Sequence, residues 1–284
     1  MKKIIDKTFS SERALYNESD VKLINCRFEG EEDGESALKE STNVDVESTY
    51  MDLRYPFWHV HNLYLNDVEM TPNCRAALWY TVNTTIDNSK LHGIKAIREC
   101  QDFIINNCDI VSPEFSWRSN NINLNDSSIV SEYAFFESHN VRLNNCKFSG
   151  KYSFQYVENL IIDNSILDTK DAFWHAKNTT VKNSTIIGEY LGWYSENLTL
   201  INCKIKGTQP LCYCKGLKLI DCYMEDADLS FEYSEVDAHI LGNMISIKNP
   251  LSGQIVVDGD SEIILVDSKY ETKAQVTLHN KENK

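Results

Sequence analysis

The sequence predicts an all-β protein: a single-stranded, right-handed parallel β-helix of about 11–13 rungs of about 19 residues each. A nine-residue phrase, seen as Asn140–Phe148 (NVRLNNCKF), recurs eleven times between about 20 and 224. Seven consecutive copies begin 19 residues apart, at 102, 121, 140, 159, 178, 197 and 216. Within each copy apolar residues alternate with polar ones, which is typical of strands, and Asn or Asp stands at two fixed positions.

Each phrase predicts two short strands joined at a corner. Positions two and four are apolar, as in Val141 and Leu143, and so are positions seven and nine, as in Cys146 and Phe148. Position six is Asn or Asp in ten of eleven copies, and position one is Asn or Asp in ten of eleven. These residues accept left-handed backbone at a bend, and stacked Asn side chains can hydrogen-bond along the stack. We expect the coil to be right-handed because parallel crossovers have that preference.

We predict one domain over residues 1–284. Residues 1–19 are expected to form an N-terminal cap, residues 20–224 the regular repeats, and residues 225–284 the irregular last rungs with a C-terminal cap. Insertions at 29–35 and 71–74 lengthen two loops, and Lys281–Lys284 are expected to fray.

Composition excludes several classes of function. A net charge of -14 argues against nucleic acid, because phosphate binding requires Lys and Arg to replace counterions. Met1-Lys2-Lys3 precedes no apolar signal core, and no run of 18 apolar residues follows, so we expect a cytoplasmic protein without membrane contact.

Nine cysteines, mostly at position seven, suggest packed free thiols. Cys203 and Cys222 share that position in adjacent rungs, although this compartment disfavours a disulfide. No metal-ligand cluster or cofactor motif is found, so we predict neither.

The ten-residue segment between phrases contains columns of a different kind. The column eleven positions before position seven is expected to face the core, and its members are Leu15, Leu38, Phe57, Leu78, Ile97, Ser116, Phe135, Phe154, Phe173, Gly192 and Leu211. The next column contains all five tryptophans: Tyr16, Lys39, Trp58, Trp79, Arg98, Trp117, Phe136, Gln155, Trp174, Trp193 and Cys212. Because an unpaired buried charge is costly, a column that accepts Lys and Arg is predicted to point outward.

The following column is polar and aromatic: Asn17, Glu40, His59, Tyr80, Glu99, Arg118, Glu137, Tyr156, His175, Tyr194 and Tyr213. Exposed aromatic rows usually mark a binding site. We therefore expect tryptophans to stack on sugar rings, and polar groups, among them Glu137 and His175, to hydrogen-bond the ligand. The predicted ligand-binding residues are Trp58, His59, Trp79, Tyr80, Arg98, Trp117, Tyr156, Trp174, Trp193 and Tyr194.

Two other interpretations of these columns remain open. The rings can form a purely structural ladder, covered by the insertions or by the tail after residue 250. They can also form an interface between copies of the chain, since Tyr and Trp are enriched at such interfaces.

Four residues are candidates for catalysis: Glu99, Arg118, Glu137 and His175. Carboxylates one or two rungs apart would lie about 5 or about 10 Å apart, a range that covers the spacings of glycosidases. However, alternating Glu99, Arg118 and Glu137 is more simply an ion-pair ladder, and a lone His175 is more simply a surface histidine.

The segments between phrases resemble an uncharacterised bacterial family, a domain of unknown function in the pectin-lyase-like β-helix superfamily. The resemblance rests on Ser11–Tyr16, Ala37–Ser41, Tyr55–His59, Arg75–Thr81, Asp171–His175, Gly188–Ser195, Gln209–Tyr213 and Phe231–Ser234, and it extends to about Asn249-Pro250. It implies the right-handed β-helix, and it assigns no catalytic residue. The wider superfamily contains many polysaccharide lyases and glycoside hydrolases.

From these observations we predict a protein that binds a carbohydrate or glycoconjugate along the aromatic columns, with glycosidase or lyase activity as an extension. The alternative is a non-enzymatic scaffold that uses the same columns for contacts with protein, including another copy of itself.

Overall fold

The computed structural model describes residues 1–30 and 34–279 and divides the chain into two compact units, Met1–Lys147 and Phe148–Lys284. We call them unit 1 and unit 2 and describe each by itself. The prediction of one domain over the whole chain therefore stays a prediction. The centre of the first acidic insertion and the predicted frayed end at Lys281–Lys284 lie outside the described residues.

Unit 1 is built from short parallel strands and one 3₁₀ helix, η1. Its elements are β1 (Lys2–Ile5), β2 (Thr8–Phe9), β3 (Ser19–Ile24), β4 (Arg27–Phe28), β5 (Thr42–Met51), β6 (His61–Met70), η1 (Pro72–Cys74), β7 (Leu78–Trp79), β8 (Val82–Asp87), β9 (Lys90–Leu91), β10 (Ile97–Arg98), β11 (Gln101–Asn106), β12 (Asp109–Val111), β13 (Asn120–Asn125), β14 (Ser128–Ser131) and β15 (His139–Asn144).

Unit 2 repeats the same construction after β16 (Lys147–Lys151), which begins at the boundary. Its strands are β17 (Glu158–Asp163), β18 (Ile166–Lys170), β19 (Lys177–Lys182), β20 (Thr185–Ile187), β21 (Glu196–Ile201), β22 (Lys204–Lys206), β23 (Leu217–Glu225), β24 (Glu235–Leu241), β25 (Ser246–Lys248), β26 (Ser252–Asp258), β27 (Glu262–Ile264) and β28 (Gln275–Leu278).

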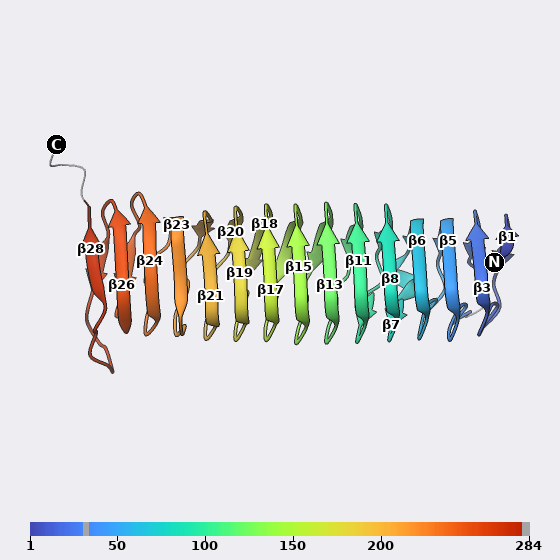
Figure 1. The fold of residues 1–284 in the computed structure, drawn as a ribbon, viewed down its shortest axis with the longest axis horizontal. Helices are drawn as coiled ribbons and strands as arrows, with labels where there is room; N and C mark the ends of the chain where they lie inside the picture. Colours follow the sequence, from blue (N-terminus) through green and yellow to red (C-terminus); the bar gives the residue numbers. More distant parts are fainter. Residues whose placement is uncertain (31–33, 280–284) are drawn as a thin grey trace. The chain divides into compact units, whose positions relative to one another are not determined.

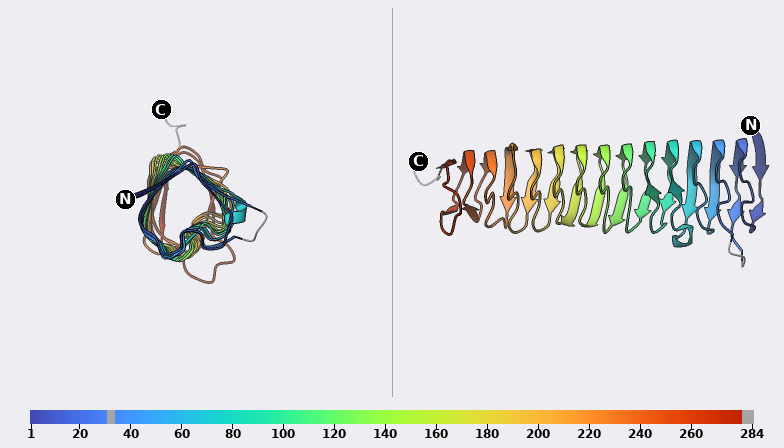
Figure 2. Two further views of the ribbon diagram at one scale, coloured as in Figure 1. Left: turned by 90° about the vertical axis from the view of Figure 1, so that its right-hand side faces the viewer. Right: turned by 90° about the horizontal axis from the view of Figure 1, so that it is seen from below.

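The strand register confirms the predicted parallel β-helix. Ile122 of β13 pairs with Val141 of β15, and Leu160 of β17 pairs with Thr179 of β19, so equivalent phrase positions stack one rung apart. Within each unit, equivalent strands of successive turns lie side by side (Figure 1) and follow nearly the same outline (Figure 2). The described residues make about 14 turns of about 19 residues, slightly more than predicted. One reason is that β1 and β2 pair with β3 and β4 in phrase register, so the segment expected as a cap forms a rung.

Asparagines at the two predicted corners confirm the expected ladders. At position one, Asn62 donates to Asn43 and Asn83 donates to Asn62. At position six, Asn202 donates to Asn183, which has a φ of 51°. Asn tolerates left-handed backbone because its short polar side chain bonds locally, whereas most side chains would be strained there.

The interior contains the predicted core column, with Phe57, Phe135, Phe154 and Phe173 completely buried. All nine cysteines are buried and free, as predicted, and Cys203 and Cys222 form no disulfide. Burial raises the pKa of Cys100 to about 12, so this thiol stays protonated and packs as an apolar group. Among the described residues, no helix has the length and apolar character needed to cross a membrane.

Candidate ligand-binding site

The tryptophans lie at the surface but are half-buried, so the column points outward less fully than predicted. In unit 1, Trp58 and Trp79 stack with ring centroids 5.4 Å apart and planes 3° apart. In unit 2, Trp174 and Trp193 stack at 5.5 Å and 6°. The faces that the paired tryptophans turn toward each other are therefore occupied. Sugar rings do not have access to these faces, which corrects the expectation that they stack there. The rings repeat along the direction in which rungs stack, so each ring covers its neighbour's face.

Every indole N–H of the column donates to a backbone carbonyl. The acceptors lie 16–18 residues further along, at distances between 2.5 and 2.8 Å: Ala76, Lys95, Tyr133, Tyr190 and Gln209. In the same column, the side-chain amide of Gln155 donates to the Asp171 carbonyl at 3.2 Å. The structural-ladder interpretation thus accounts for the inner faces and for the polar edges of the tryptophans.

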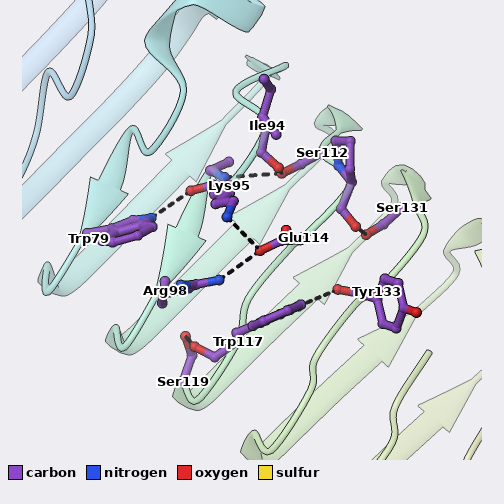
Figure 3. Close-up of polar contacts among 12 residues, drawn as sticks. Trp79, Ile94, Lys95, Arg98, Ser112, Glu114, Trp117, Ser119, Ser131 and Tyr133 are labelled. Atoms are coloured by element: carbon purple, nitrogen blue, oxygen red, sulfur yellow. Dashed lines mark hydrogen bonds and ion pairs between the residues drawn. The ribbon is translucent and has the colours of Figure 1, made fainter. Parts of the chain in front are cut away.

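Arg98 lies between two tryptophans in unit 1 (Figure 3). Its guanidinium carbon is 4.7 Å from the Trp79 ring centroid and 4.6 Å from that of Trp117. Its Nη2 donates to Glu114 at 2.8 Å, and Lys95 Nζ lies 3.2 Å from the same carboxylate oxygen. Each cation–π contact contributes about 0.5–2 kcal/mol, which explains how a column of tryptophans accommodates a charge. Arg98 Nε is buried without a hydrogen-bond partner among the described residues.

The polar column next to the tryptophans forms a third corner of the rung, which the sequence did not predict. His59, Tyr80, Tyr156, His175 and Tyr194 all have φ between 54° and 60°. Left-handed backbone costs such residues about 1–2 kcal/mol, since they lack the local hydrogen bond available to Asn. The rings stack in compensation, at 4.8 Å for His59 and Tyr80 and at 5.1 Å for His175 and Tyr194.

The catalytic candidates of unit 1 are engaged with one another. Arg118 Nε donates to Glu137 at 2.8 Å, and this bond raises the pKa of Arg118. Glu99 adds a weaker electrostatic contribution of the same sign to that pKa. The ion-pair interpretation is confirmed for Arg118 and Glu137, while a catalytic role for these residues stays a prediction. In unit 2, His175 lies between the rings of Tyr156 and Tyr194. Among the described residues no group of His, Cys, Asp and Glu is arranged to hold a metal ion.

A surface cleft in unit 1 brings some of the predicted binding residues together with others that were not predicted. It has a volume of about 450 Å³, and its lining consists of Tyr55, Trp58, Arg75, Ala76, Trp79, Ile94 and Lys95. We call it the aromatic cleft. Arg75 directly follows η1 and the insertion at 71–74, and η1 projects from the outline of the rungs in Figure 2. Arg75, Ile94 and Lys95 were missed because they lie outside the two aromatic columns. The irregular loop length before Arg75 was the sole signal for that residue, and Ile94 and Lys95 lie in a rung of the regular 19-residue spacing.

A family model described as "Protein of unknown function (DUF3737)" matches residues 2–279. The chain belongs to this family. This membership confirms the resemblance seen in the segments between phrases. No curated protein matches the chain.

Solved structures similar to this family member are β-helix proteins of low sequence identity. The lacto-N-biosidase of family GH136 from Eubacterium ramulus is 8% identical, with a TM-score of 0.39; the alignment covers 88% of this chain and 63% of that one. The tailspike protein of E. coli bacteriophage HK620, solved with a pentasaccharide, is 7% identical with a TM-score of 0.42, covering 98% and 70%. Endopolygalacturonase I from Stereum purpureum is 10% identical with a TM-score of 0.37, covering 98% and 95%.

Proposed function

We propose that this protein binds a carbohydrate or glycoconjugate in the aromatic cleft of unit 1. The observation that carries the proposal is the lining of the cleft, which combines the aromatic Tyr55, Trp58 and Trp79 with the apolar Ala76 and Ile94 and with two cations. Its volume of about 450 Å³ falls within the roughly 300–1,000 Å³ typical of small-molecule sites.

The cleft offers both kinds of contact that a sugar requires. A sugar ring has apolar C–H patches surrounded by hydroxyl groups, so it needs apolar surface and hydrogen-bonding groups together. Ile94 is 45% exposed and supplies apolar surface. The Tyr55 hydroxyl has no hydrogen-bond partner among the described residues and is therefore able to bond a sugar hydroxyl. Glycosidase or lyase activity would be an extension of binding, with Glu99, Arg118, Glu137 and His175 as the residues to examine.

The competing proposal is self-association or scaffolding through the polar aromatic column of unit 2. Tyr156 and Tyr194 are 48% and 44% exposed there, which leaves apolar surface for a protein partner.

Substitution of Tyr55 tests the carbohydrate proposal. We expect the wild-type protein to bind members of a glycan array and Tyr55→Ala to lose about tenfold in affinity, because it removes both an aromatic contact and a hydroxyl. Tyr64→Ala is the matched control, since Tyr64 is an exposed tyrosine of β6 outside the cleft. Light scattering on the same samples measures mass. A dimeric protein without any glycan ligand would reject carbohydrate binding and favour the scaffold.

A further inference from the structure

The aromatic cleft has a local charge opposite to that of the chain. The chain has a net charge of -14, yet the residues that line the cleft include Arg75 and Lys95 and no carboxylate. Charges within about 8 Å dominate at physiological salt, so a bound group experiences these cations more strongly than distant acidic residues. The cleft therefore favours a negatively charged ligand.

The backbone holds Arg75 in a fixed and unusual conformation. Its φ is 49° and its ψ is -102°, a combination that ordinary side chains rarely adopt. Its N–H donates to the Pro72 carbonyl at 3.1 Å, and its carbonyl accepts the N–H of Lys95 at 3.1 Å. Gly93 packs so closely that a Cβ there would lie 2.6 Å from the Arg75 carbonyl oxygen. The main chain of Arg75 is thus anchored to the next rung.

The side chain of Arg75, in contrast, has no ion-pair or hydrogen-bond partner among the described residues, and the residue is exposed. Its neighbouring cations are compensated: Glu114 accepts from Arg98 at 2.8 Å and lies 3.2 Å from Lys95 Nζ. Figure 3 shows Lys95 and Arg98 directed at this carboxylate. Arg75 is therefore the uncompensated charge of the cleft, on an anchored backbone, and it shares the cleft lining with Trp58 and Trp79.

We propose that the ligand of the aromatic cleft is an acidic sugar, bound through its carboxylate by the Arg75 guanidinium. This inference rests on the proposed carbohydrate function and narrows it. A guanidinium presents two parallel N–H donors that match the two oxygens of a carboxylate, and this geometry makes the pair both strong and specific. Trp58 and Trp79, which also line the cleft, contact the C–H surface of the sugar ring.

The test compares uronate-bearing and sialylated oligosaccharides with their carboxyl-reduced, neutral forms, measured by calorimetry on the full chain. We expect the acidic forms to bind at least about tenfold more tightly, and Arg75→Gln to remove that preference, as expected for loss of a charge-assisted pair. Arg142→Gln is the control, since Arg142 is an exposed arginine of β15 outside the cleft. Citrate and inorganic phosphate serve as non-sugar anions.

Each outcome separates the two proposals. Equal binding of acidic and neutral forms would overturn the acidic-sugar inference and leave carbohydrate binding intact. Binding of neither form would reject carbohydrate binding itself. Equal binding of citrate or phosphate would show a general anion site and overturn the inference. Circular dichroism of Arg75→Gln verifies folding, and Arg75→Lys, which retains charge but not the two-pronged donor, is expected to recover part of the affinity.

Discussion

At the residue scale, the column of tryptophans is defined by an N–H donor as much as by an aromatic ring. All five indoles donate to a carbonyl of the next rung, and Gln155 makes the same bond with an amide. A β-helix rung leaves backbone carbonyls at its corners that strands do not pair, and buried carbonyls need partners. The column of tryptophans therefore has a structural role, which is to supply donors to these carbonyls. Any ligand binding would be an additional role.

Replacing one indole measures that role. Trp174→Phe retains a ring against Trp193 but leaves the Tyr190 carbonyl without its 2.7 Å donor. We expect the free energy of unfolding to fall by about 1–2 kcal/mol, the cost of an unsatisfied carbonyl with a smaller stack. Urea denaturation measures the change. Tyr223→Phe, at an exposed tyrosine of β23, is the control and is expected to change the free energy of unfolding by less than about 0.5 kcal/mol. A Trp174→Phe protein as stable as wild type would contradict the bond's contribution.

At this scale, residue spacing alone predicts which side chains share a column. The alignment of columns correctly placed Phe57 and Phe173 in the core and Trp58 and Trp174 at the surface. Spacing fixes which side chains share a column, but it does not fix how far each ring leans toward its neighbour. For that reason the structural ladder was one of three open interpretations, and the structure was needed to show the face-to-face stacking that makes the inner faces unavailable to a ligand.

At the scale of elements, two corners were predicted and the third was not. Asn at positions one and six indicates left-handed backbone. Tyr80, His175 and Tyr194 also adopt left-handed backbone, although their residue types do not indicate it. Stacking and inter-rung hydrogen bonds offset the strain of these bulky residues. The aromatic cleft was not predicted either, because Arg75 follows a loop insertion and Lys95 lies outside the aromatic columns.

The last strand of unit 2 is held by a chain of titratable groups. His239 of β24 contacts Asp221 through Nδ1 at 2.7 Å and Asp258 through Nε2 at 3.1 Å. His279, which follows β28, contacts the other Asp258 oxygen at 3.0 Å. The hydrogen bond to Asp221 is the main cause of a raised pKa for His239, and the bond to His279 lowers the pKa of Asp258.

These shifts predict that the contacts of β24 with β26 are strongest in mildly acidic solution. The His239 contribution is complete below the unfolded histidine pKa of about 6.5 and is lost as pH rises through the raised folded pKa. The Asp258 contribution is present above the unfolded pKa of about 4 and is lost as pH falls through the lowered folded pKa. Hydrogen exchange, corrected for intrinsic rates, should show greater protection of β26 (Ser252–Asp258), which contains the Asp258 partner of His239, at pH 5.5 than at pH 8.5. His239→Gln should reduce this difference, and His61→Gln, at an exposed histidine of unit 1, should not. Equal protection at both pH values in wild type would contradict the assignment.

At the scale of the whole molecule, the repeat and the site obey different constraints. The repeat needs the same strand register in every rung. Its residue types therefore recur at fixed positions and can be recognised in the sequence. The proposed site needs a departure from the repeat, and the aromatic cleft lies where Arg75, directly after the insertion at 71–74, lines the same cleft as Trp58 and Trp79. A chain of net charge -14 repels anions at long range, so the acidic-sugar proposal implies slow capture that added salt accelerates.

Because each rung of unit 2 contacts mainly its neighbours, one rung should be removable without changing the fold. Deletion of residues 178–196 joins Lys177 to Asn197 and preserves the phase of the phrase, since β17 would then meet the strand that now pairs with β19. We expect a folded, cooperative protein with a free energy of unfolding lower by about 1–3 kcal/mol, in proportion to the residues lost. Deletion of 178–195 shifts the register by one residue and turns core side chains outward, so it should not fold. Circular dichroism and urea denaturation distinguish the two; equal behaviour of both deletions would refute a register-controlled repeat.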